Sequence, residues 1–146
     1  MPPGEGMAFE LEMPAKARYV GLARLLAGSI ARRLRFTEES IDDLKIAISE
    51  MCTNAIVHTG NGDIGKPPIL VRYLTGNDFL TIEVKDQGPG FDPRSVLGRE
   101  RIDLLGKGFG IPLIQSLVDV FECDSQPDTG TVVSITKYLR PETEES

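Results

Sequence analysis

The pattern of apolar and polar positions along the chain predicts five short strands. Stretches in which the two kinds of residue alternate are found at residues 8–13, 69–74 and 79–85, and two further strands are expected at 121–125 and 131–139. The first ends at Pro14 and carries acidic residues, which is typical of an edge strand. The second and third flank Thr75-Gly76-Asn77-Asp78, and the last two are joined by Gln-Pro-Asp-Thr-Gly, so we expect two hairpins.

Three other segments have apolar residues at helical spacing. Lys16–Leu34 predicts an amphipathic helix, and Thr37 is a good N-cap for a second helix that runs to about His58. Two glutamates follow Thr37, where the helix dipole favours anions. Ile111–Val120 predicts a short third helix.

The order of these elements is strand, two helices, two strands, helix, two strands. Because helices do not alternate regularly with strands, we expect an α+β fold rather than a parallel doubly wound sheet. The expected architecture is a two-layer sandwich in which three helices cover one face of a mixed, mostly antiparallel sheet. A chain of 146 residues suits one such domain, expected over residues 8–139, with a disordered N-terminus at 1–7 and a disordered acidic tail at 140–146.

Composition argues against two classes of function, nucleic-acid binding and membrane insertion. The net charge is −6, whereas a protein that binds nucleic acid directly needs a basic face. No apolar run approaches the roughly 20 residues of a membrane span, and the N-terminus lacks the features of a signal peptide. We therefore expect a cytoplasmic protein that binds neither nucleic acid nor membrane, with Cys52 and Cys123 as reduced, buried thiols.

The second helix carries a row of polar residues, Glu50, Asn54 and His58, at i, i+4 and i+8. An amide oxygen such as that of Asn54 is a hard ligand suited to Mg²⁺, and the Glu50 carboxylate can accept a proton from a nucleophile that attacks a phosphate. A solvated face of an ordinary helix would carry the same residues, so this row alone is weak.

Two glycine-rich segments follow. Asp86 ends a strand before Gly88 and Gly90, where a carboxylate can accept a hydrogen bond from an adenine amino group. Gly106-Lys107-Gly108-Phe109-Gly110 precedes a helix, and backbone N–H groups in such a loop suit a phosphate chain. The polar segment between them, residues 92–105, is expected to form a mobile cover. Thr131 opens the last strand, and its hydroxyl could assist on the adenine side.

A strand-ending turn, a solvated loop and an ordinary strand threonine would each explain one of these features. The combination, in this order, favours an ATP site with Mg²⁺. It also resembles the Bergerat-type ATP-binding fold shared by gyrase, the heat-shock chaperone, sensor histidine kinases and mismatch-repair ATPases. Within that superfamily, S-E-M-C-T-N-A-I-V-H, G-K-G-F-G-I-P-L-I and D-T-G-T-V-V-S-I-T-K-Y-L resemble bacterial anti-sigma factor serine kinases.

This resemblance implies roles for individual residues. The general base falls on Glu50, the metal-holding asparagine on Asn54 and the adenine aspartate on Asp86. The nucleotide-binding glycines fall on Gly88, Gly90, Gly106, Gly108 and Gly110. An arginine of the first helix that grips the sigma factor falls on Arg24.

The implied function is that of a serine kinase. It would phosphorylate an anti-anti-sigma protein, sequester a sigma factor and so regulate transcription by partner switching, and family analogy suggests a homodimer. Two alternatives stay open: an ATP-gated binding module without significant kinase activity, and a detached histidine-kinase-like ATPase domain. The latter acts on a histidine of a helical hairpin that this chain lacks, and Glu50 favours the kinase over the simple binder.

Overall fold

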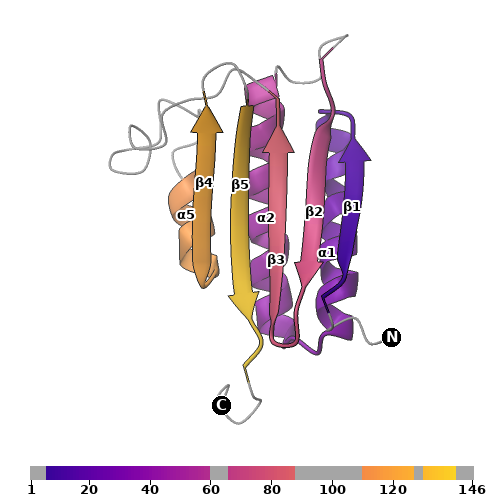
Figure 1. Ribbon diagram of the computed structural model, residues 1–146, viewed down its shortest axis with the longest axis vertical. Coiled ribbons are helices and arrows are strands. Elements are labelled where there is room, and N and C mark those ends of the chain that lie inside the picture. Colours follow the sequence, from indigo (N-terminus) through magenta and orange to yellow (C-terminus); the bar gives the residue numbers. More distant parts are fainter. Residues whose placement is uncertain (1–5, 60–65, 88–109, 127–129, 141–146) are drawn as a thin grey trace.

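One sheet and a layer of helices make up the protein (Figure 1). The computed structural model describes residues 6–59, 66–87, 110–126 and 130–140. Within these ranges the elements are β1 (Ala8–Met13), the 3-10 helix η1 (Ala17–Tyr19), α1 (Val20–Arg33), α2 (Glu38–Thr59), β2 (Ile69–Thr75), β3 (Phe79–Asp86), α5 (Gly110–Leu117), β4 (Val120–Gln126) and β5 (Gly130–Tyr138). The predicted α+β fold is confirmed.

The sheet has the strand order β1-β2-β3-β5-β4. All four pairings among these strands are antiparallel, so the sheet is more regular than the mixed one expected. Both predicted hairpins, β2–β3 and β4–β5, are present, and β1 lies at an edge as predicted. The β4–β5 hairpin folds back so that β5, not β4, lies beside β3, which brings the start of β5 next to the end of β3.

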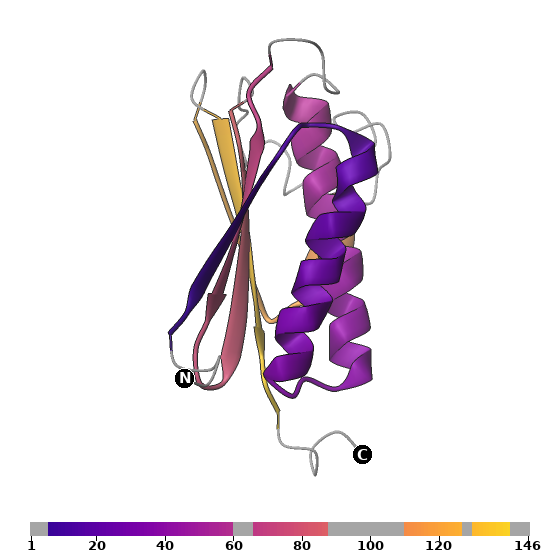
Figure 2. The ribbon, with the colours of Figure 1, turned by 90° about the vertical axis from the view of Figure 1, so that its right-hand side faces the viewer.

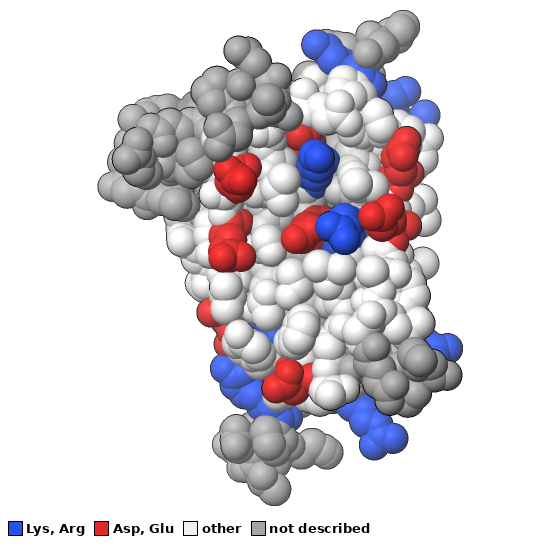
Figure 3. All heavy atoms as spheres, in the orientation of Figure 1, with Lys and Arg blue, Asp and Glu red and all other residues white. Residues whose placement is uncertain are grey.

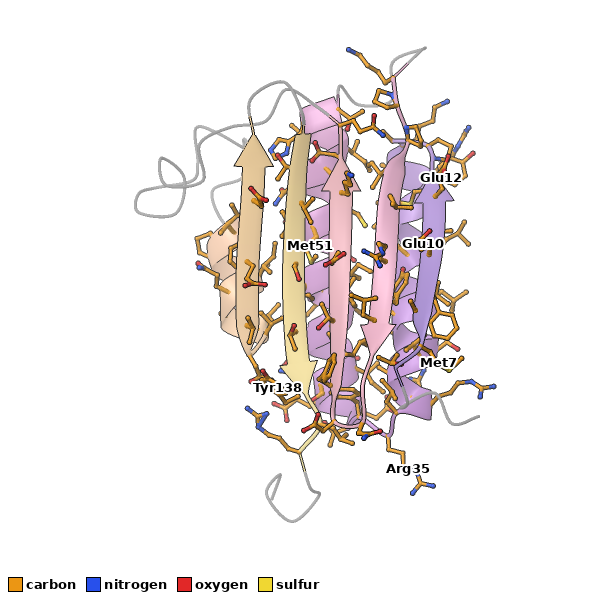
Figure 4. The ribbon with its side chains drawn as sticks, in the orientation of Figure 1. Met7, Glu10, Glu12, Arg35, Met51 and Tyr138 are labelled. Carbon is orange, nitrogen blue, oxygen red and sulfur yellow. The ribbon has the colours of Figure 1, made fainter. Side chains whose placement is uncertain are left out.

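The helices cover one face of the sheet (Figure 2). The apolar stripe of α2 is buried against the inward side chains of the strands, and Met51 is visible behind the sheet in Figure 4. The largest fully buried side chains come from both layers and include Tyr73, Ile82 and Ile135 of the sheet and Ile41, Leu44 and Ile48 of α2. The core therefore lies between α2 and the central strands, and α2 runs the length of the sheet.

Local hydrogen bonds set the ends of the two long helices. The Ser40 N–H donates to Thr37 Oγ1 at 3.1 Å, which confirms Thr37 as the N-cap of α2. Before it, α1 ends at Arg33 and the chain reverses through Arg35, whose φ is +70°. The Phe36 N–H donates to the Ala31 carbonyl at 3.1 Å, a Schellman-type ending in which an arginine takes the left-handed position that glycine usually holds.

The other face of the sheet carries no helix among the described elements and is crossed by charged side chains (Figure 3). Arg72 of β2 pairs with Glu10 of β1 and with Glu83 of β3, each at 3.2 Å, and the three residues lie directly opposite one another in the register. Glu10 and Glu12 are seen on this face of β1 in Figure 4. Such exposed pairs contribute little energy, but opposite charges placed in line favour this register over a shifted one.

Helix α5 is shorter than predicted, because Val120 already belongs to β4. Its C-terminal end is fixed by Lys137 of β5. The Lys137 Nζ donates to the Leu117 carbonyl at 2.9 Å and pairs with Asp43 of α2 at 3.4 Å. This largely buried ammonium group ties α5, α2 and β5 together and so holds the helix that follows the second glycine-rich segment.

Both cysteines are free, as predicted, but only Cys52 is buried, whereas Cys123 is partly exposed. Burial raises the pKa of the Cys52 thiol to about 12. Burial, and then the charges of Asp124 and Asp86, raise the pKa of Cys123 to about 11. Both thiols are therefore protonated at neutral pH and are poor nucleophiles. Among the described helices, none combines the length and apolar composition that crossing a membrane requires.

Candidate nucleotide-binding site

Buried polar side chains gather at one end of the core. This end, uppermost in Figure 1, is where α2, β3 and β4 finish and β5 begins. Of the buried polar residues in the described part of the chain, only Thr75 lies elsewhere, at the end of β2. The others are Asn54, Thr59, Asp86, Ser125 and Thr131. Polar groups inside a core are costly unless they are satisfied, so their concentration here marks a candidate site.

Helix α2 contributes the predicted row of Glu50, Asn54 and His58. Glu50 is half-buried, and Asn54 is 7% exposed. Because residues four apart lie one turn apart on a helix, the carboxylate, amide and imidazole follow one another towards the end of the core where α2 finishes.

Asp86 is the last residue of β3 and is only 2% exposed. His58 Nδ1 lies 3.4 Å from its Oδ2, so the row on α2 meets the end of β3. The register between β3 and β5 places Asp86 directly opposite Thr131. The structure thus brings His58, Asp86 and Thr131 together, and Asn54 is buried one turn before His58 on α2.

Ser125 of β4 belongs to the same group, although the sequence pattern did not indicate it. Its hydroxyl lies 2.7 Å from Thr131 Oγ1, and both residues are buried. The strand β4 places Phe121, Cys123 and Ser125 on the side of the sheet that faces the helices. A serine at the third inward position of an otherwise apolar series was the signal that could have identified it.

At Gly130 the backbone of β5 lies in close contact with the backbone of β3. The φ of this glycine is +111°, which side chains other than hydrogen rarely permit. A Cβ placed there would clash with the carbonyl oxygen of Asp86 and come within 3.0 Å of the Asp86 carbonyl carbon. The start of β5 can therefore approach the end of β3 only because residue 130 is glycine.

We predict that Gly130→Ala lowers the free energy of unfolding by about 1–3 kcal/mol, since it adds both backbone strain and a clash with Asp86. Gly21→Ala is the matched control. Gly21 lies in α1, and a Cβ added there would meet no atom within 4 Å, so alanine should leave stability unchanged or raise it. Urea unfolding of both variants checks this, and a Gly130→Ala protein as stable as the wild type would contradict the close approach.

Several predicted residues lie outside the described ranges. They are Gly88, Gly90, Gly106, Lys107, Gly108 and Phe109, together with the expected cover at residues 92–105. Gly110, the last glycine of the second segment, is the first residue of α5 and is buried. This agrees with the expectation that the glycine-rich segment leads directly into a helix.

Arg24 is exposed on α1, whereas the residues of the buried polar group belong to α2 and the strands. The position of its helix is fixed by Tyr73, a fully buried residue of β2 whose hydroxyl donates to the Ala23 carbonyl at 2.8 Å. The side chain of Arg24 is thus carried on a helix anchored to the sheet, with its guanidinium available at the surface.

The chemistry of the buried group fits a nucleotide with a metal ion. A buried carboxylate and two hydroxyls can line the edge of a purine base, with Asp86 as the acceptor for an amino group. An amide oxygen such as that of Asn54 suits Mg²⁺, and a half-buried carboxylate one turn earlier suits proton transfer. The described residues contain no cluster of acidic, histidine or cysteine side chains that would hold a metal without help from a ligand.

The chain is similar to known proteins over most of its length. Residues 13–137 match the model of the histidine kinase-like ATPase domain family. The chain is 39% identical over 142 residues to the serine-protein kinase RsbW of Bacillus pumilus, covering 91% of this chain and 86% of the relative. It is 36% identical over 141 residues to RsbW of Bacillus subtilis, with the same coverage.

A solved structure has the same fold. The crystal structure of the RsbU and RsbW domains of Rv1364c from Mycobacterium tuberculosis superposes with a TM-score of 0.67 at 20% identity. The match covers 92% of this chain and 33% of that longer chain.

Proposed function

Because the chain belongs to the histidine kinase-like ATPase domain family and, within it, to the RsbW serine-protein kinases, we propose that it is an ATP-dependent anti-sigma factor kinase. It transfers the γ-phosphoryl group of ATP to a serine of an anti-anti-sigma protein. It holds a sigma factor when that protein is phosphorylated. A cytoplasmic location and a homodimer are part of the proposal, and sedimentation of the purified chain tests the dimer.

One observation carries the proposal: the polar row of α2 meets the buried Asp86 and Thr131 at one end of the core. A solvated helix face would explain the row, and a strand-ending turn would explain Asp86, but neither explains why they converge. The Asp86 residue is only 2% exposed, and a buried carboxylate that meets a polar helix face at the end of a core is typical of a ligand site.

Each residue of the site has a proposed role. Asp86 accepts the hydrogen bond from the adenine amino group, and Thr131 assists beside it. Asn54 would hold Mg²⁺ through its amide oxygen, and the metal would supply positive charge beside the phosphates. Glu50 accepts the proton of the attacking serine hydroxyl, and the glycines before α5 bind the phosphate chain through their N–H groups.

The proposal is tested by incubating the purified chain with Mg²⁺, labelled ATP and a candidate anti-anti-sigma protein. Transfer of one labelled phosphoryl group to a serine of that protein supports it. Tight binding of ATP and a sigma factor without any transfer would favour the ATP-gated binder instead.

We propose that the sigma factor is bound on the surface of α1 that carries Arg24. Leu22 and Leu25 lie one turn apart on the exposed side of α1 and are 52% and 69% exposed, and Arg24 lies at the edge of that side. Exposed leucines one turn apart are unusual for a solvated helix face, and arginine is enriched in protein interfaces. A partner with an acidic and apolar patch fits this composition.

Arg24→Ala is expected to abolish binding of the sigma factor and to leave ATP affinity unchanged, since Arg24 is exposed on α1 and the proposed nucleotide site is built from α2 and the strands. The control is Arg33→Ala, an exposed arginine nine residues later that projects from the opposite side of α1. Pull-down of the sigma factor measures its binding to both variants, and ATP titration measures their nucleotide affinity. Sigma factor retained by Arg24→Ala at wild-type strength would remove Arg24 from the interface.

A further inference from the structure

The contact between His58 and Asp86 joins two elements that are far apart in the sequence. His58 lies in the last turn of α2 and Asp86 at the end of β3, with 15% and 3% of their side chains exposed. The 3.4 Å distance joins His58 Nδ1 to Asp86 Oδ2. An ionised carboxylate only accepts hydrogen bonds, so this contact requires a proton on Nδ1.

We propose that His58 is a positioning residue for nucleotide recognition: it orients the Asp86 carboxylate for the adenine amino group and so sets the preference for adenine over guanine. The proposal rests on the proposed function, in which Asp86 binds adenine. A carboxylate offers about four acceptor positions, so a bond from His58 on Oδ2 is compatible with a second bond from the base.

The backbone and the side chain of Asp86 are held by different residues. Gly130 packs closely against the Asp86 carbonyl, and the β3–β5 register places Thr131 opposite it, so the main chain is fixed from the β5 side. The Asp86 carboxylate can rotate easily about χ2, because this torsion of aspartate has broad energy minima. The imidazole of His58 supplies the restraint from the α2 side.

Orientation of the carboxylate matters for the choice of base. Adenine presents an amino group at its sixth position, whereas guanine presents a carbonyl oxygen there and an N–H beside it. A carboxylate fixed to face the sixth position accepts from adenine and repels the guanine oxygen. A carboxylate that can rotate reaches the neighbouring N–H of guanine, so loosening it reduces the discrimination between the two bases.

A purely structural role for His58 makes a different prediction. A histidine in the last turn of a helix can interact with the helix dipole or simply fill space. If packing were its role, phenylalanine would replace it better than the smaller asparagine. If the Nδ1 donor is its role, asparagine, whose amide nitrogen occupies nearly the same place, would replace it better than phenylalanine.

The test measures affinity for ATP and GTP in the presence of Mg²⁺ by calorimetry for His58→Phe and His58→Asn. We expect His58→Phe to bind ATP about tenfold more weakly and to show a smaller ATP-to-GTP preference, as loss of a hydrogen bond to a charged group implies. His58→Asn should stay within about threefold of wild type. Unchanged affinity and preference in His58→Phe, or a loss in His58→Asn as large as in His58→Phe, would overturn the proposal.

A double-mutant cycle with Asp86→Asn separates this inference from the proposed function. If His58 acts through Asp86, His58→Phe should have no further effect in the Asp86→Asn background. If Asp86→Asn itself leaves ATP affinity unchanged, the adenine site is wrong. If Asp86→Asn weakens ATP binding and His58→Phe does not, only the role of His58 is wrong.

A spectroscopic measurement tests the contact directly. His58 is the only histidine of the chain, so the ¹⁵N signals of an untagged sample report one imidazole. We expect the proton on Nδ1 and a shift of the Nδ1 signal in Asp86→Asn, with no comparable shift in Asp78→Asn at the exposed turn between β2 and β3. An Nδ1 signal that is the same in all three proteins would overturn the contact.

Discussion

Glu50→Gln is expected to reduce phosphoryl transfer to the serine substrate by about 10²–10⁴-fold while ATP affinity changes little. Glutamine keeps the size of the side chain and much of its hydrogen bonding, but it cannot accept the serine proton. Glu50 lies on α2 one turn before Asn54 and is half-buried. A single-turnover assay at saturating ATP isolates the transfer step.

Asn54→Ala is the matched comparison, because it removes the neighbouring group on the same helix face. The metal would lose a ligand, so both nucleotide affinity and transfer should fall. A Glu50→Gln protein that transfers phosphate at the wild-type rate would exclude Glu50 as the general base. Equal losses of ATP affinity in the two variants would instead indicate that Glu50 helps to hold the metal.

Asp86→Asn is expected to weaken ATP binding by about ten- to a hundredfold, the loss of a charge-assisted hydrogen bond of roughly 1.5–3 kcal/mol. The carboxylate is 2% exposed and therefore acts in a less polar medium than water, where its loss matters more. The same change at Asp78, exposed at the β2–β3 turn, should leave affinity unchanged.

Calorimetric titration with ATP checks this second prediction, and thermal unfolding confirms that each variant is folded. Wild-type affinity in Asp86→Asn would remove Asp86 from the adenine site. A drop in stability that accompanies unchanged affinity would assign the carboxylate to the fold alone.

The strands and helices could be predicted well because their determinants are local. Alternating residues gave β1, β2 and β3 within a residue or two, and the hydroxyl of Thr37 marked the start of α2. The edge position of β1 followed from its acidic outward residues, which the structure places on the open face.

The end of α1 could not be placed as well, because Arg35 takes the left-handed conformation without being glycine. The hydrogen bond from Phe36 to Ala31 and the burial of the Phe36 side chain fix that turn, and both depend on packing. The boundary between α5 and β4 was misplaced for a similar reason. Val120 fits an apolar helix position as well as a strand position, and its pairing with Thr136 decides in favour of the strand.

The sequence predicted individual residues of the candidate site, but it did not predict the contacts between them. The spacing of the α2 row and the position of Asp86 at a strand end were visible in the sequence. The approach of His58 to Asp86 across 28 residues of sequence was not, because it depends on how α2 packs against β3. The pairing of Ser125 with Thr131 was not visible either, because it depends on the exact register of the β4–β5 hairpin. The roles of the glycines at 88–90 and 106–109 stay predictions from the sequence.

We expect this end of the core to bind ATP and to pass its γ-phosphoryl group to a protein serine. Mass spectrometry of an anti-anti-sigma protein after incubation with the wild-type chain, Mg²⁺ and ATP measures this transfer. We expect the addition of one phosphoryl group on a serine, and almost none in the same time with Glu50→Gln. An unmodified substrate in the presence of a wild-type chain that demonstrably binds ATP would contradict it.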